Sequence, residues 1–382
     1  MERRRILIVG GGVIGLLTAI ECVSAGHTVV LVDRGDIPCG AATSYDRQRV
    51  IRALHLGDPA ATGAAVRAHG RWLALQGLLS TTFYEQVGAL TALPAADAPG
   101  ARAMLVVAGA RARVLGPDDL RSSYPHVEFP AGASAVLESD AGVLLADRVL
   151  TTCADWLRRH PRAALHPRRT AVTIEGTGVR LADGEVLTAD SVLLAAGPWS
   201  RELLGTRLGA RLVLRRQSVL YCTVPVADTR AWARTPPILS LGADGGAWLV
   251  PPVAGTPLKL SAASACRVAT EIGDHTTPPA WREHLLDTFA GIIAGLGADW
   301  LTGTRDCWYL SHPATGGPML AVLGGRVLSY AACGGASFKF APLIARSLAA
   351  RLTAAAPPVL PMIVRRRRVP APAVRPAAEA TL

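Results

Sequence analysis

Lysine is nearly absent from this chain of 382 residues. Among its 40 basic residues, lysine occurs only as Lys259 and Lys339, and every other one is arginine. A compact ammonium and a planar guanidinium are not interchangeable where a charge must fit a small site or change its protonation state. Both positions are therefore candidates for function, although chance survival of the two lysines would produce the same pattern.

Cysteine is present, but in no pattern that would build a framework. The seven cysteines are odd in number and irregularly spaced, and the sequence contains no C-x-x-C motif. This spacing argues against a disulfide-stapled fold and against a zinc centre. We therefore expect no metal site and mostly small, buried thiols. The cysteines are Cys22, Cys39, Cys153, Cys222, Cys266, Cys307 and Cys333.

Long apolar runs free of charge are missing as well, which predicts no membrane span. One stretch imitates a secretory signal, because the basic start "MERRR" precedes an apolar segment. That segment contains several glycines and Glu21, which a strand and a helix explain better than a signal does. We therefore expect a cytoplasmic protein without a membrane partner.

Negative charge is in deficit, since the formal net charge is +11. Part of the excess lies in the C-terminal segment 353–382, which is rich in proline and alanine and carries an arginine run at 365–368. This composition predicts a disordered tail. An arginine cluster can contact nucleic acid or an acidic membrane. No nucleic-acid-binding motif accompanies it, so a solvated tail is favoured and no nucleic-acid partner is expected.

What the chain does contain is a strand–turn–helix–strand pattern over residues 5–35. A buried strand is predicted at 6–9, a G-x-G-x-x-G motif follows, and an acidic residue ends the second strand. The glycines allow a tight turn, close approach of backbone N–H groups to a pyrophosphate, and close helix packing. Dinucleotide binding is the favoured interpretation, and an empty Rossmann-type fold is the alternative. The predicted cofactor-binding residues here are Gly10, Gly12, Val13, Ile14, Gly15, Asp33 and Arg34.

The rest of the chain predicts an α/β fold with a discontinuous Rossmann-like nucleotide-binding domain. We assign residues 1–80, 145–210 and 318–352 to that domain, and residues 81–144 and 211–317 to a second domain that is largely antiparallel sheet. Gly197 follows a strand at 192–195 and is expected to lie against the cofactor. Gly335 belongs to a second glycine turn that opens the last helix. Helices are predicted at 60–79, 147–159 and 281–296.

Two local predictions concern segments between these elements. Residues 38–55 begin as a small-residue loop and are expected to become helical, with Arg49 and Arg52 on one helix face. The segment from about residue 80 to 143 is expected to form short strands and turns, including 103–109 and 115–125.

Several short motifs occur in the chain in an order that matches a known protein family. They are "GGGVIG" with Asp33, "RQRVIR", "LLAAGPWSRELL", "PLKL", "CWY" and "CGGASFKF". Over about residues 1–352 the chain resembles the FAD-dependent amine oxidases of the sarcosine oxidase and N-methyltryptophan oxidase group, in the D-amino-acid-oxidase-like superfamily. The resemblance implies FAD in the Rossmann-like domain and a substrate domain over the flavin ring.

The resemblance also implies roles for individual residues near the flavin. Cys307 matches the cysteine that covalent members attach to FAD, although an ordinary buried thiol is the alternative. Lys259 matches the lysine that activates oxygen, and a fixed ammonium there would stabilise charge that develops on oxygen. Arg49 matches a basic residue beside the flavin ring, although an arginine on a helix surface is the alternative. Tyr309 matches an active-site tyrosine of the group.

The implied substrate site departs further from the family pattern than the flavin site does. Arg52 and Lys339 match the pair that holds the substrate carboxylate, and Lys339 also counts among the predicted cofactor contacts. Sarcosine-oxidising members carry histidines in the loop before "RVIR", where this chain has "YDR" with Tyr45 as the predicted substrate contact. Ala263 stands where another histidine is expected. A larger or cyclic amino acid is therefore a more plausible substrate than sarcosine.

These observations predict a flavin-dependent oxidase of a small secondary or cyclic amino acid, with a possible place in specialised metabolism. A substrate hydride would pass to FAD, an imine would form, and molecular oxygen would become hydrogen peroxide. One alternative is a flavin dehydrogenase that passes electrons to a carrier. Another is a non-catalytic FAD- or NAD-binding protein whose basic tail contacts a partner, since NAD alone also satisfies the N-terminal fingerprint.

Overall fold

The computed structural model describes residues 2–355. The predicted tail therefore lies outside the described residues, apart from its beginning at residues 353–355. Within the described part, none of the helices combines the length and the apolar character that crossing a bilayer needs.

The nucleotide-binding sheet is six-stranded and is built from the beginning, the middle and the end of the chain. Its neighbouring strands pair in parallel, except that β20 runs antiparallel to β21. The central strands β1, β13 and β21 are almost entirely buried, which explains why they appear in the sequence as continuous apolar runs, whereas the edge strand β9 is partly exposed. In spatial order the strands are β20 (Pro318–Gly324), β21 (Val327–Cys333), β13 (Ser191–Leu194), β1 (Arg5–Val9), β2 (Thr28–Val32) and β9 (Ala163–His166).

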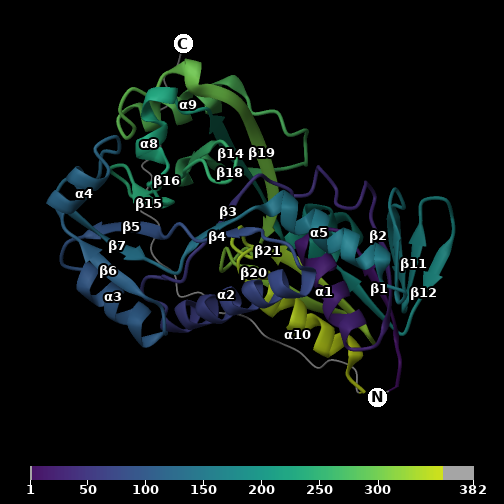
Figure 1. The fold of residues 1–382 in the computed structure, drawn as a ribbon. Coiled ribbons are helices and arrows are strands. Elements are labelled where there is room, and N and C mark those ends of the chain that lie inside the picture. The colour runs from purple at the N-terminus through teal and green to yellow at the C-terminus, as the bar shows by residue number, and fades with distance from the viewer. Residues whose placement is uncertain (1, 356–382) are drawn as a thin grey trace, which may run out of the picture.

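Helices from distant parts of the chain cover this sheet. α1 packs on α10 and α5, and α10 also contacts α2, so that the purple helix α1 and the yellow helix α10 lie together in Figure 1. Asp58 accepts a hydrogen bond from the backbone N–H of Ala61 at 2.8 Å and caps α2. These helices are α1 (Val13–Ser24), α2 (Pro59–Leu79), α5 (Ala146–Arg159) and α10 (Ala341–Thr353).

A nine-stranded sheet forms the second large layer. Its neighbouring strands pair antiparallel except for β15 and β5, and α9 (Pro279–Ala290) packs on β14 and β17. In spatial order the strands are β18 (Cys266–Ala269), β14 (Val213–Cys222), β17 (Leu258–Ala262), β16 (Ala247–Val250), β15 (Ile238–Leu241), β5 (Ala89–Pro94), β7 (Ala133–Glu138) and β6 (Ala112–Leu115), and β19 (Leu301–Ser311) pairs with β14 outside this order.

Smaller elements complete the fold. One three-stranded meander consists of β10 (Ala171–Glu175), β11 (Gly178–Leu181) and β12 (Val186–Thr188), and another three-stranded sheet consists of β3 (Arg49–Ile51), β8 (Gly142–Leu144) and β4 (Tyr84–Glu85). The short helices are α3 (Ala98–Val107), α4 (Pro117–Ser123), α6 (Ser200–Leu203), α7 (Gly205–Leu208) and α8 (Thr229–Trp232). The predicted fold class is confirmed. The domain limits stay a prediction, because β3 pairs across them with β8.

Two local predictions were wrong. The segment expected to become helical before residue 55 instead forms β3, where Arg49 lies opposite Leu144. Val50 and Ile51 are β-branched and suit a strand, and Arg52 lies beyond the end of that strand. The stretch 103–109, predicted as a strand, belongs largely to α3, and the expected turn after Gly116 contains α4. The backbone N–H of Gly116 donates to the Asp119 carboxylate at 3.0 Å, which favours helix initiation there.

Candidate active site

A cavity of about 410 Å³ lies between the ends of the parallel strands and the nine-stranded sheet. It begins at the glycine turn after β1 and reaches β14, β19 and β21. Ligands of open α/β sheets bind at the carboxyl ends of the strands, where this cavity begins. Of the residues predicted from the sequence, those that line it are Gly10, Gly12, Val13, Ile14, Asp33, Arg34, Arg49, Gly197, Cys307, Tyr309 and Gly335.

The glycine turn leaves no room for side chains. Gly10 has φ +112°, and a Cβ there would lie 2.3 Å from the carbonyl oxygen of Ala195. A Cβ on Gly15 would lie 1.9 Å from the carbonyl oxygen of Gly10, which explains the close packing of α1 on β1. Gly12 precedes the first turn of α1, where backbone N–H groups lack partners within the helix, and of these the N–H of Val13 donates to Ser44. This arrangement suits an anionic group.

Asp33 and Arg34 lie beside this turn. The backbone N–H groups of Gly11 and Gly35 donate to the Asp33 carboxylate at 2.7 and 2.8 Å. Burial raises the pKa of Asp33 and these hydrogen bonds oppose the rise. Each carboxylate oxygen retains capacity to accept from a hydroxyl. The Arg34 guanidinium lies 5.0 Å from the ring centroid of Trp199, which also lines the cavity.

Lys259 lies directly behind the cavity wall. It projects from β17, its side chain is 2% exposed, and it forms an ion pair with the buried carboxylate of Asp46. Its ammonium lies 5.7 Å from the ring centroid of Trp248, and Trp248 lines the cavity. Lys259 does not itself line the cavity, so the structure places it one side chain away.

Asp46 joins Lys259 to further charged and polar groups. Arg49 lies 3.2 Å from the same carboxylate oxygen as Lys259, and the Tyr221 hydroxyl donates to the other oxygen at 2.5 Å. Burial opposes the charged form of Asp46, but Lys259 and Arg49 dominate and lower the pKa of Asp46. Burial lowers the pKa of Lys259 despite Asp46. Cys307 is close enough to contribute to the pKa of both Arg49 and Lys259.

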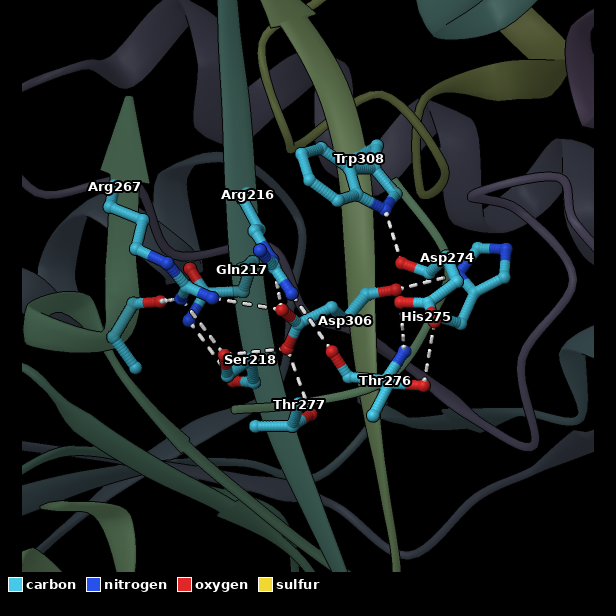
Figure 2. Close-up of polar contacts among 11 residues, drawn as sticks. Arg216, Gln217, Ser218, Arg267, Asp274, His275, Thr276, Thr277, Asp306 and Trp308 are labelled. Carbon is cyan, nitrogen blue, oxygen red and sulfur yellow. Dashed lines mark hydrogen bonds and ion pairs between the residues drawn. The ribbon is translucent and has the colours of Figure 1, made fainter. Parts of the chain in front are cut away.

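Cys307 is held in place by the residue that precedes it. Successive side chains of a strand point to opposite faces, so Asp306 of β19 points away from the cavity while Cys307 faces it. Figure 2 shows polar side chains converging on Asp306, which is fully buried. Its carboxylate accepts from Ser218 at 2.6 Å, Thr277 at 2.8 Å and Arg267 at 2.8 Å, and also from Arg216.

The same network fixes a neighbouring loop. Arg216 donates to the carbonyl oxygen of Thr276 at 2.8 Å, and the Trp308 indole N–H donates to that of Asp274 at 3.1 Å. The backbone N–H of Asp306 donates to the carbonyl oxygen of His275 at 2.9 Å. β14, β19 and the loop at 274–277 are thus one unit behind the cavity (Figure 2).

Tyr309 lies two residues beyond Cys307 and shares its face of β19. Its hydroxyl contacts the Cys266 thiol at 3.2 Å, and burial raises the pKa of Tyr309. A Cβ on Gly335 would lie 3.0 Å from the Tyr309 ring, so the glycine at 335 lets the turn after β21 approach closely. Cys307, Tyr309 and Gly335 therefore line the same end of the cavity.

Comparison with known proteins decides which family this geometry belongs to. A family model described as "DAO: FAD dependent oxidoreductase" matches residues 5–351. The chain belongs to this family. The sequence predicted membership of a family of FAD-dependent oxidoreductases, and this match confirms it.

Its curated relatives include oxidases of small amino acids. The chain is 30% identical over 229 residues to a glycine oxidase of Pseudomonas putida, covering 55% of this chain and 59% of that protein. It is 24% identical over 220 residues to a peroxisomal sarcosine oxidase of Mus musculus, covering 56% of each. The matches thus span less than two thirds of these relatives.

Solved structures of similar fold cover nearly the whole chain. A modified fructosyl peptide oxidase from Aspergillus nidulans matches with a TM-score of 0.75 at 20% identity, over 91% of this chain and 90% of that one. NikD, described as an unusual amino acid oxidase essential for nikkomycin biosynthesis, matches with a TM-score of 0.74 at 18% identity, over 92% and 94%. At such identities the likeness shows the fold.

The cavity of this DAO-family chain fits FAD. Its glycine-lined end, where a Cβ on Gly10 would meet backbone, lies at the N-terminus of α1 and suits the pyrophosphate. Asp33 is placed to accept from a ribose hydroxyl. The opposite end, with Arg49, Cys307 and Tyr309, suits the flavin ring.

The predicted substrate residues are not among those that line the FAD cavity. The Arg52 guanidinium donates to the carbonyl oxygen of Leu54, and the Lys339 ammonium lies 5.4 Å from the Phe340 ring centroid. Both Arg52 and Lys339 nevertheless influence the buried carboxylate of Glu138. Burial raises the pKa of Glu138, and the positive charges of the two residues oppose this rise. The structure thus brings them to one region.

Tyr45 and Ala263 lie elsewhere. Tyr45 lines a second, more open pocket of about 990 Å³, together with Asp46 and Tyr221. Ala263 is exposed in a short turn after β17 and does not line the FAD cavity. The expected effect of Ala263 on the substrate pocket stays a prediction.

Sequence reasoning missed several residues of the site. Asp46 was noted only as a departure from a histidine pattern, although an isolated acid in the arginine-rich "YDRQR" was a usable signal. Trp248, Tyr330 and Ser44 line the cavity and carried no sequence signal. Ser44 accepts from the N–H of Val13 at 3.2 Å at the start of α1. Among residues 2–355, no group of three or more His, Cys, Asp or Glu side chains is placed to hold a metal ion.

Proposed function

We propose that the protein is an oxidase of a small secondary or cyclic amino acid, which forms an imine and reduces oxygen to hydrogen peroxide. The observation that carries the proposal is the buried Lys259–Asp46 pair behind the Trp248 wall of the FAD cavity. When bound, FAD supplies the redox chemistry by accepting hydride from the carbon beside nitrogen and passing electrons to oxygen. Relatives named glycine oxidase and sarcosine oxidase support a small amino acid as the substrate class.

The residues of the chain itself would bind and orient the substrate and would stabilise the charge that develops on oxygen. We assign the substrate carboxylate to Arg52 and Lys339, because both cations lower the pKa of the same buried carboxylate, Glu138, and a guanidinium can bind a carboxylate through two hydrogen bonds. Tyr45 is a further proposed substrate contact. Arg49 and Tyr309 would border the reacting atoms, and Lys259 would stabilise negative charge as it develops on oxygen.

The remaining cofactor contacts follow the cavity. The glycines and Asp33 would hold the dinucleotide, and Gly197 and Gly335 are proposed contacts further along the cavity. Lys339, which does not line the cavity, is also a proposed cofactor contact. We also propose that Cys307 links covalently to the flavin through its sulfur. Support comes from its burial at 5% exposure, its place on the cavity wall and the fixed strand around it.

Two broader assignments also belong to the proposal. A role in specialised metabolism rests on the altered segment before β3, where "YDR" replaces the histidines of sarcosine-oxidising members. We also propose a cytoplasmic location.

Acid precipitation followed by a substrate panel tests the function. Yellow colour in the pellet supports the link through Cys307, yellow in the supernatant refutes it, and no yellow after purification contradicts FAD binding. Glycine, sarcosine, proline and larger cyclic imino acids are then added to the holoenzyme without oxygen, and flavin bleaching is recorded. Peroxide formed in air supports an oxidase. Bleaching without peroxide would instead favour a dehydrogenase, and no bleaching by any amino acid would refute the substrate class.

A further inference from the structure

Asp46 is a buried carboxylate whose oxygens have different partners. Oδ2 forms the ion pair with Lys259 and lies 3.2 Å from Nη2 of Arg49. Oδ1 accepts hydrogen bonds from the Tyr221 hydroxyl at 2.5 Å and from the backbone N–H of Arg47 at 2.7 Å. The carboxylate is therefore held in one orientation, and each of these contacts favours its charged form.

The charge of Lys259 depends on the groups that face it. These are Asp46 from the segment before β3, Arg49 from β3, Tyr221 from β14 and Cys307 from β19. Burial and the charge of Arg49 disfavour the ammonium, whereas the charge of Asp46 and its hydrogen bond favour it. Asp46 is the carboxylate in direct contact, so its removal would leave a buried ammonium beside a guanidinium.

We propose that Asp46 is a positioning residue that keeps Lys259 protonated and directed at the Trp248 wall of the cavity, so that the reaction with oxygen depends on Asp46. The part of this inference that concerns the reaction with oxygen rests on the proposed function. The part that concerns the protonation of Lys259 by its ion pair with Asp46 does not. A fixed positive charge beside the cavity stabilises negative charge that develops on oxygen. A neutral amine at the same place lacks that effect.

The ion pair lies near a second pocket but is itself buried. Asp46 and Tyr221 are among the residues that line this pocket, whereas Trp248 lines the FAD cavity. The side chains of Asp46 and Lys259 are 0% and 2% exposed. Because water is excluded from the pair, the charge of Lys259 depends on the groups in direct contact with it.

The lysine content of the chain makes the protonation state measurable. Lys259 and Lys339 are its only lysines, so holoenzyme labelled with ¹⁵N-lysine gives one side-chain resonance for each, and Lys339→Arg assigns them. We expect Lys259 to be charged near neutral pH in the wild type and neutral there in Asp46→Asn. An opposite charge at this range changes a protonation equilibrium by about 10- to 1,000-fold.

A matched control separates this effect from a general loss of charge. Asp147→Asn makes the same chemical change in a residue that lines the second pocket and pairs with Arg47 at 3.5 Å. We expect it to leave the Lys259 titration unchanged, and Asp46→Glu to restore much of the wild-type titration. Neutral Lys259 in the wild type, or equal titrations in wild type and Asp46→Asn, would overturn the proposal. The wild-type titration decides alone if Asp46→Asn does not fold.

Stopped-flow kinetics test the link to oxygen without a known substrate. Chemically reduced holoenzyme is mixed with oxygenated buffer across a pH range. We expect Asp46→Asn to react about tenfold or more slowly near neutral pH and to recover toward lower pH, where Lys259 regains its proton. If the rate of Asp46→Asn equals that of the wild type, or falls by the same factor at every pH, the proposed dependence of the oxygen reaction on Asp46 is overturned. If reduced Lys259→Met reacts with oxygen as fast as the wild type, the observation that carries the proposed function is refuted. The titration of the lysine resonances would then still test whether Asp46 keeps Lys259 protonated.

Discussion

Replacing Asp306 by alanine should destabilise the protein and disturb Cys307 at the same time. The carboxylate is fully buried, and it pairs with Arg216 and Arg267, whose side chains are 22% and 19% exposed. Removal of one partner of a buried ion pair costs about 3–5 kcal/mol in general. Because both guanidinium groups partly reach solvent, we expect a cost of about 2–4 kcal/mol here.

The assay for this prediction is chemical unfolding of the holoenzyme, followed by tryptophan and flavin fluorescence. Asp306→Asn keeps the side-chain size and tests the charge alone, and it should shift the midpoint in the same direction. Asp118→Asn is the control, since Asp118 is 93% exposed in its pair with Arg121 and should leave the midpoint unchanged. A shift no larger than that of the control would refute the reasoning. A second readout is the fraction of flavin in the acid pellet, which should fall if the network positions Cys307.

Four further substitutions test the cavity and its surroundings. Gly10→Ala should abolish FAD retention on gel filtration, because its Cβ would lie 2.3 Å from the Ala195 carbonyl oxygen at φ +112°; normal flavin content would contradict this. Arg52→Ala should mainly raise KM, by about 2–5 kcal/mol of lost charge pairing, and an unchanged KM would remove Arg52 from the substrate site. Cys307→Ser should release all flavin to the acid supernatant, and flavin left in the pellet would point to another residue. Lys259→Met should slow reoxidation by about 10²–10³-fold while flavin reduction changes little, and equal effects on both steps would speak against its oxygen role.

The glycine turn was predictable because its information is local. Tight turns, close approach of backbone and an acidic residue after the second strand all follow from residues within one βαβ unit. The discontinuous sheet could also be predicted, because Ser191–Leu194 and Val327–Cys333 appear in the sequence as short apolar runs that suit buried parallel strands. The odd lysine content identified Lys259 before its environment was known.

What could not be predicted depends on contacts far apart in the chain. Arg49–Ile51 is a strand because it pairs with β8, almost a hundred residues away, and local helix spacing carried no trace of this. Asp46 and Lys259 are 213 positions apart, so no local pattern shows that one neutralises the other. The Asp306 network likewise joins residues from β14, β18, β19 and a loop, and only the fold brings them together.

The geometry around Lys259 also explains why a lysine persists there in a chain that otherwise uses arginine. The ammonium donates to Asp46, lies 3.4 Å from the carbonyl oxygen of Gln48 and is flanked by the rings of Tyr221 and Trp248. A guanidinium would carry more N–H donors into this enclosed space, and each buried donor without a partner costs about 1–3 kcal/mol. Arginine is also fixed in its charged form, whereas a lysine can change its protonation state when buried. This site accommodates a compact cation whose charge depends on one carboxylate. Arginine is neither compact nor able to change its protonation state.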